Sequence, residues 1–230
     1  MALTMGQALA AVRERLDEVD SAGWSDTELR RWINEAVTDI ARKTETVQST
    51  TTIDVDAGEQ EHTLPATVLR VYRATYTEDG NDHIYPLEYV DFNAADSVWW
   101  SDQAITESRP RMFTMWGYPP TLKAILYPKP SVNGTLTVYY YAAPAALATN
   151  GSADTTGLSV VEGFTDLVLE YAAYMALRRD RDPRWREHKA YYDEHMGVML
   201  DQTRRWSDQA GTISRQGYGL PDWLVGGYGY

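Results

Sequence analysis

The sequence contains no cysteine. Disulfide bonds and thiolate chemistry are therefore excluded, and stability must come from a buried core or from assembly. No run approaches the roughly 18 apolar residues that a membrane-spanning helix needs. Met1–Gln7 also lacks the basic and apolar pattern of a signal peptide. We expect a soluble chain that is made in the cytosol.

Basic side chains are scarce. The chain has 21 Lys and Arg against 33 Asp and Glu, a net charge of −12. Residues 1–60 hold much of this imbalance, with 6 basic and 12 acidic side chains. General nucleic-acid binders usually carry a basic patch or a high pI, so the composition argues against tight DNA binding. It is compatible with a surface past which DNA slides without sticking.

Phenylalanine is rare as well, but the other aromatic residues are not. Three Phe stand against 8 Trp and 16 Tyr. Trp and Tyr combine a large apolar area with a polar atom, and both are enriched at protein interfaces. Aromatic-rich β-domains show the same bias, so the composition suggests interaction surfaces without proving them.

Both ends of the chain have helical patterns. Apolar residues from Met5 to Val19 recur every three or four positions, and Ser25 with Glu28 forms a capping box before a second stripe that ends at Ile40. The stretch from Ser159 to Gln209 predicts two more helices, the first opened by a Ser159–Glu162 capping box. Asp182-Pro183 separates them as N-cap and first helical residue. Four amphipathic helices most economically pack on one another.

The middle of the chain has strand patterns instead. Glu78–Asp82 is a hairpin turn signal, and Glu88–Trp100 could form a short helix. The sequence predicts β-strands at Ser49–Val55, Thr67–Thr77, His83–Leu87, Arg111–Trp116, Thr121–Leu126 and Gly134–Ala142. Short strands with tight turns favour an antiparallel sheet or a small sandwich.

The expected fold class is α+β: a four-helix bundle formed by the N- and C-terminal helices, with an inserted antiparallel β-domain. We expect a first helical part at 1–45, the β-domain at 46–157, a second helical part at 158–209 and an extended tail rich in aromatic residues and Gly at 210–230.

Known catalytic motifs are missing. The sequence has no Walker loop, no G-x-S-x-G elbow, no H-E-x-x-H and no EF-hand loop. His188 and His195 share a helix face, but seven residues separate them by about 10.5 Å, too far for one zinc ion. His62 and His83 have no evident carboxylate partner, so we interpret them as surface or interface residues. We predict no enzyme activity, no catalytic or metal-binding residue and no cofactor.

The end of the chain is unusual because it combines many Gly with large apolar side chains. Dense Gly disfavours a helix and makes an ordered conformation costly in backbone entropy. Tyr and Trp are common anchors at interface hot spots. We therefore predict that the tail Gly211–Tyr230 docks on another protein or a neighbouring subunit, through Tyr218, Leu220, Trp223, Leu224, Tyr228 and Tyr230.

Several passages resemble one known family. They are Trp24–Leu29 leading into Trp32–Ala36, Thr63-Leu64-Pro65, Pro86–Asp91, Leu126–Pro130 with the exit Ala142-Ala143-Pro144, and the segment Leu167–Ala172. Together they resemble the head-to-tail connector proteins of tailed bacteriophages, also called adaptors. The resemblance covers roughly residues 8–205 and rests on packing and turn patterns.

The resemblance implies a helical bundle with an inserted β-domain, arranged as a ring beneath the portal vertex, commonly of twelve copies. Such a ring is a structural part of the virion neck, with no enzymatic activity and no cofactor. It extends the DNA channel, and its partners are the portal protein, tail or nozzle proteins, and DNA that passes without specific binding; no membrane is involved. The alternative is a carbohydrate-binding module that uses exposed Trp and Tyr of the β-domain. Helices at both ends argue against that alternative.

Overall fold

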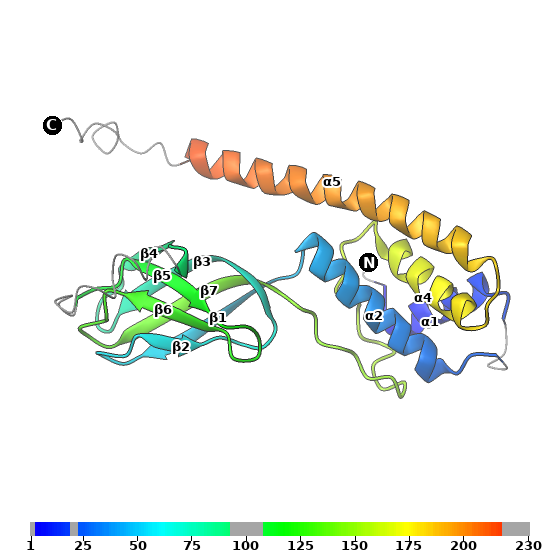
Figure 1. Ribbon diagram of the computed structural model, residues 1–230, viewed down its shortest axis with the longest axis horizontal. Coiled ribbons are helices and arrows are strands. Elements are labelled where there is room, and N and C mark those ends of the chain that lie inside the picture. The colour runs from blue at the N-terminus through cyan, green and yellow to red at the C-terminus, as the bar shows by residue number, and fades with distance from the viewer. Residues whose placement is uncertain (1–2, 19–22, 93–107, 218–230) are drawn as a thin grey trace. The chain divides into compact units, whose positions relative to one another are not determined.

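The protein is described from a computed structural model, which covers residues 3–18, 23–92 and 108–217, with side chains through Arg205. The chain divides into two compact units (Figure 1). The helical unit contains residues 1–36 and 148–230, and the β unit contains Val37–Leu147.

The first two helices begin with capping boxes. Before α1 (Met5–Arg15), the Gln7 backbone N–H donates to the Thr4 hydroxyl at 3.3 Å, and the Thr4 N–H donates to the Gln7 side chain at 3.0 Å. Helix α2 (Asp26–Thr44) opens with the predicted box, in which the Glu28 N–H donates to the Ser25 hydroxyl at 3.3 Å. Both boxes satisfy amide groups that a helix start leaves without partners.

The two C-terminal helices begin later than predicted. Helix α4 (Thr165–Arg179) starts after Phe164, whose side chain makes no capping bond, so the predicted capping box at Ser159 and Glu162 is wrong. Asp182 does accept a hydrogen bond from the Arg184 N–H at 2.9 Å, in the turn before α5 (Trp185–Gly217).

Helix α5 also ends later than predicted. It runs to Gly217, past the expected end at Gln209, so the expectation that Gly excludes a helix from residue 211 onward is wrong for 211–217. Only the two ends of that segment, Gly211 and Gly217, are glycines. Its interior therefore carries no glycine to disfavour the helix.

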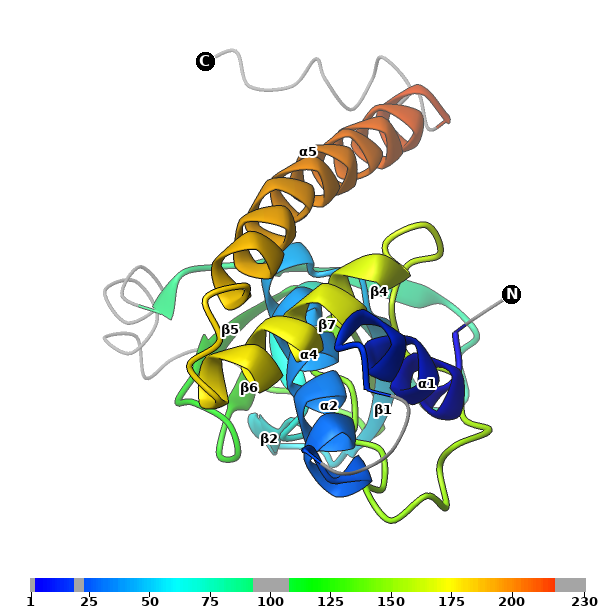
Figure 2. The same cartoon turned by 90° about the vertical axis from the view of Figure 1, so that its right-hand side faces the viewer.

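The predicted four-helix bundle is wrong. Helix α4 packs against α1 and against α5 (Figure 2), and α4 itself is buried over most of its surface. Helix α5 has 33 residues against 15 in α4, or about 50 Å against 22 Å at 1.5 Å per residue. Its described buried side chains end at Met199, while Asp201 and Gln202 are exposed. An amphipathic stripe predicts a helix, but it does not specify the partner on which the helix packs.

The β unit contains all six strands that the sequence predicts and one that it misses. They are β1 (Gln48–Val55), β3 (Val68–Glu78), β4 (Ile84–Tyr89), β5 (Met112–Trp116), β6 (Lys123–Tyr127) and β7 (Gly134–Ala142), and the missed strand is β2 (Glu61–Thr63). The helix expected at Glu88–Trp100 begins within β4, and residues 93–100 lie outside the described residues.

The strands form one mixed sheet in the order β1-β7-β3-β4-β5-β6-β2, curled into a nearly closed barrel (Figure 1). The prediction of an antiparallel domain is wrong at one place, because β4 and β5 are parallel. A parallel pair needs a long connection, and residues 90–111 supply it. Inward-facing residues from β1 and β3 through β7, such as Val55, Leu126 and Leu136, form one continuous apolar core.

Strand β7 shows how the sequence positions this core. Its residues alternate between buried and half-buried over the whole length of the strand, as expected when one face meets the core. Gly134 starts the strand because a Cβ there would lie 2.6 Å from the Tyr76 hydroxyl and would overlap the Thr77 carbonyl. Among the described helices, none is both long and apolar enough to cross a bilayer.

Candidate interaction surfaces

Strand β3 contains two bulges that change which side chains reach the surface. Its pairing with β7 skips one residue between Val68 and Arg70 and another between Val71 and Arg73. A bulge leaves one residue unpaired and re-aims its side chain. As a result Leu69 and Tyr72 are exposed beside Arg70 and Arg73.

The bulged strand builds a cluster with two tyrosines of β7. The Tyr72 ring lies 4.9 Å from the Tyr141 ring and 6.4 Å from the Tyr139 ring. Arg70 lies over Tyr141 at 5.2 Å and Arg73 over Tyr139 at 5.3 Å, within the range of cation–π attraction. We call this surface the bulged face; its residues are Leu69, Arg70, Tyr72, Arg73, Tyr139 and Tyr141.

The two arginines of the bulged face differ in their pairing. Arg70 forms an ion pair with Glu45, whereas Arg73 makes no ion pair with any described residue. Burial raises the pKa of the Tyr72 phenol, and the neighbouring Tyr141 and Tyr139 raise it further, so Tyr72 stays neutral at physiological pH. The face therefore presents the neutral Tyr72 ring and, in Arg73, a cation without a carboxylate partner among the described residues.

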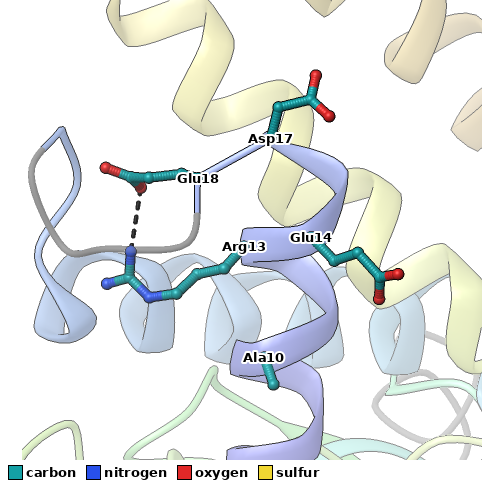
Figure 3. A pocket seen from close by; sticks show the side chains of 5 residues that line it. All are labelled: Ala10, Arg13, Glu14, Asp17 and Glu18. Atoms are coloured by element: carbon teal, nitrogen blue, oxygen red, sulfur yellow. Dashed lines mark hydrogen bonds and ion pairs between the residues drawn. The ribbon is translucent and has the colours of Figure 1, made fainter.

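A second surface lies at the C-terminal end of α1. It is a hollow of about 510 Å³ lined by Ala10, Arg13, Glu14, Asp17 and Glu18, which we call the acidic hollow (Figure 3). Arg13 is neutralised there, because it pairs with Glu18 at 3.0 Å and with Asp26. Figure 3 shows Glu14 and Asp17 pointing away from Arg13.

The two outward carboxylates leave the rim of the hollow anionic. Glu14 makes no ion pair with a described residue. Asp17 pairs with Arg184 at 3.2 Å, but 83% of its side chain remains exposed. The hollow can therefore receive a cationic side chain from another molecule.

Ion pairs connect helices elsewhere in the helical unit. The buried Glu170 of α4 accepts from the Arg15 Nε of α1 at 2.9 Å and lies 2.6 Å from the His188 Nδ1 of α5. Arg30 of α2 makes two 3.0 Å contacts with the Asp154 carboxylate. These bonds join segments that are far apart in the sequence.

The basic cluster at Arg178–Lys189 is partly neutralised as well. Arg179 donates to Glu28 at 2.6 Å, and Arg184 pairs with Asp182 at 2.9 Å. The pKa of the Glu28 carboxyl is held below its usual value, first by the hydrogen bond from Ser25 and then by the bond from Arg179. Arg179 and Arg184 therefore use their charge in ion pairs within the helical unit.

The four histidines have separate environments. His62 is buried with its Nε2 unpaired, so its interpretation as a surface or interface residue is wrong. Burial lowers its pKa and keeps the ring neutral. His83 lies against Tyr85 at 4.5 Å, and His195 stacks on Tyr191 at 3.8 Å. Within the described ranges, no three His, Asp or Glu side chains group as a metal site.

The docking residues predicted from the sequence are not among the residues of these two surfaces. The six predicted docking residues, Tyr218, Leu220, Trp223, Leu224, Tyr228 and Tyr230, all lie outside the described residues. The bulged face was missed, although Thr67–Thr77 carries a signal for it. Apolar and polar residues alternate there only with interruptions, and such interruptions accompany bulges.

A family model described as SU10 adaptor protein matches residues 3–215. The chain belongs to the SU10 adaptor protein family. The match includes every described helix and strand of both units, apart from the last two residues of α5. The predicted phage adaptor family is thereby confirmed, and this SU10 adaptor family member is a structural protein of a bacteriophage. No curated protein matches the chain.

Proposed function

We propose that this protein is a structural adaptor of a bacteriophage neck. It forms a ring under the portal, joins the head to the tail and extends the DNA channel. The observation that carries the proposal is the family match over residues 3–215, because it includes both units rather than one shared module. No observation favours the carbohydrate-binding alternative.

The proposed ring contains twelve copies, is located in the virion neck and is built from chains made in the host cytoplasm. Its partners are the portal protein on one side, tail or nozzle proteins on the other, and DNA in the lumen. It works mechanically, without catalysis or a cofactor. A net charge of −12 supports transit without specific binding, since tight phosphate binding depends on Lys and Arg.

We assign attachment to the portal to the tail beyond α5. The residues that carry it are Tyr218, Leu220, Trp223, Leu224, Tyr228 and Tyr230. Because α5 ends at Gly217, deletion of residues 218–230 removes the anchors and leaves the helix in place. We expect the truncated chain to fold normally and to bind the portal more weakly.

Binding of the full and truncated chains to the portal protein of the same phage tests this function. Native mass spectrometry should give a portal complex that carries twelve copies of the full chain. Trp223→Ala should weaken portal binding by about 2 kcal/mol, as loss of a hot-spot anchor does. Tyr191→Ala is the control, because Tyr191 is an exposed aromatic residue within α5. A portal that binds no copies would contradict the function, and undiminished binding of the truncated chain would contradict the role of the tail.

A further inference from the structure

The bulged face has the exposure and composition of a protein–protein interface. In a regular strand neighbouring side chains point to opposite faces, so one of Leu69 and Arg70 would turn inward, and one of Tyr72 and Arg73. The two bulges of β3 leave both residues of each pair exposed. Tyr and Arg dominate the face, as they do at the centres of protein interfaces. Its Arg73 is held against Tyr139 and lacks an anionic partner among the described residues.

We propose that the bulged face of one copy docks in the acidic hollow of the next copy, with Arg73 facing Glu14. This inference rests on the proposed ring. A closed ring of identical chains requires two different complementary surfaces on each chain. The β unit supplies the cationic, aromatic surface and the helical unit supplies the anionic hollow.

Charge complementarity selects a second copy as the occupant. Arg73 is the one cation of the bulged face without a carboxylate among the described residues, and Glu14 is a carboxylate of the hollow without a described cation. A new ion pair between copies would therefore break no ion pair within a copy. Tyr72, 44% exposed beside Arg73, can enter the hollow along with it.

DNA fits the bulged face less well than a second copy does. Affinity for a phosphate backbone comes from several Lys and Arg acting together. Here Arg70 is already paired with Glu45. A single available guanidinium surrounded by tyrosines matches one carboxylate of a protein.

Cysteine crosslinking tests the contact cleanly because the chain has no cysteine of its own. The full chain with Arg73→Cys and Glu14→Cys, assembled on the portal of the same phage and treated with a bismaleimide, should give a ladder of multimers on a denaturing gel. Ladders require head-to-tail contacts, and the bismaleimide spans the gap that an Arg–Glu pair leaves between its Cβ atoms, which is wider than the roughly 3.5–4.5 Å of a disulfide. Arg31→Cys with Glu14→Cys is the matched control, since Arg31 is exposed and lies 5.9 Å from the Trp32 ring. Monomers only, or an equal ladder in the control, would overturn the proposal.

Charge exchange gives a second and independent readout. Arg73→Glu should reduce the yield of rings at least tenfold, and adding Glu14→Arg should restore it. Arg31→Glu changes the net charge equally and should leave ring yield unchanged. No rescue by the double variant would overturn the pairing. Loss of DNA retention in Arg73→Glu with ring yield unchanged would instead assign the face to DNA.

Electron microscopy of the same samples separates failure of the contact from failure of the function. Rings without a crosslinked ladder would leave the adaptor function standing and exclude this interface. The absence of rings from unmodified chain on the portal would contradict the adaptor function itself.

Discussion

The two units of this protein hold their elements together in different ways. In the β unit, strands are joined by backbone ladders around a main apolar core that includes Val55 and Ala142, beside a smaller cluster at Ile125 and Tyr127. In the helical unit, buried apolar residues are supplemented by ion pairs between distant segments, such as Arg15–Glu170 and Arg30–Asp154. The stability of the helical unit should therefore depend more on individual charged side chains, and that of the β unit more on shape and packing.

The largest expected effect comes from overfilling the β unit. Gly134→Ala places a Cβ 2.6 Å from the Tyr76 hydroxyl and against the Thr77 carbonyl. We expect the free energy of unfolding to fall by about 3 kcal/mol, the upper range for overpacking. Urea denaturation followed by circular dichroism measures this loss.

Gly197→Ala is the control for that variant. Gly197 lies within α5, and a Cβ there meets nothing within 4 Å. Because alanine favours a helix over glycine by about 1 kcal/mol, this change should stabilise the protein. An equal loss of stability in both variants would show that packing at Gly134 is not the cause.

In the helical unit, removal of one buried carboxylate should have the next largest effect. Glu170→Ala leaves His188 without this carboxylate and leaves Arg15 with only its contact to Asp166 at 3.0 Å. We expect a loss of about 2 kcal/mol in the free energy of unfolding, the scale for an unsatisfied, partly buried charged group. Glu187→Ala, at an exposed site on α5, should change stability little. Similar losses in the two variants would contradict the role assigned to Glu170.

In the β unit, His62 is a buried side chain whose ordinary pKa lies near neutral pH. Burial lowers the pKa of His62, so the folded chain takes up a proton less readily than the unfolded chain. Its contribution to stability is complete above about pH 6.5 and decreases as the pH falls below that value, by at most about 1.4 kcal/mol per pH unit. His62→Leu should remove this dependence, and unfolding measured from pH 7.5 to 5.5 checks it. An unchanged pH dependence in His62→Leu would exclude this histidine as the source.

The smallest effect is expected at the start of α2. Ser25→Ala removes the hydroxyl that accepts from the Glu28 N–H, and loss of an N-cap costs about 1 kcal/mol. Thr27→Ala is a matched control, because Thr27 is an exposed hydroxyl residue in the same turn and has no described capping bond. Thermal unfolding compares the two. A larger loss in Thr27→Ala would contradict the capping assignment.

Much of the secondary structure could be predicted because periodicity reflects burial directly. Gly134–Ala142 alternates along its whole length and was predicted with its observed ends, and the Ser25–Glu28 box marked the start of α2. What could not be predicted depends on partners distant in the sequence. Strand β2 has only three residues and is defined by its pairing with β6. Helix α5, whose described buried residues end at Met199, packs on an α4 of only 15 residues.

The candidate surfaces show the same limit. The bulges at Leu69 and Tyr72 leave only an interrupted alternation in the sequence, and the register with β7 is what locates them. The burial of His62 likewise follows from its place on β2 opposite Ala124, which the sequence does not reveal. The composition indicates interaction surfaces built from Trp and Tyr, but it does not identify which of these residues lie on the surface.

The most direct test of the adaptor function is a cryo-electron microscopy reconstruction of the full chain bound to the portal of the same phage. We expect a closed ring on the same axis as the portal, with both units of every copy in the ring and an open central channel. A single bound copy, or density in which the channel is blocked, would contradict it.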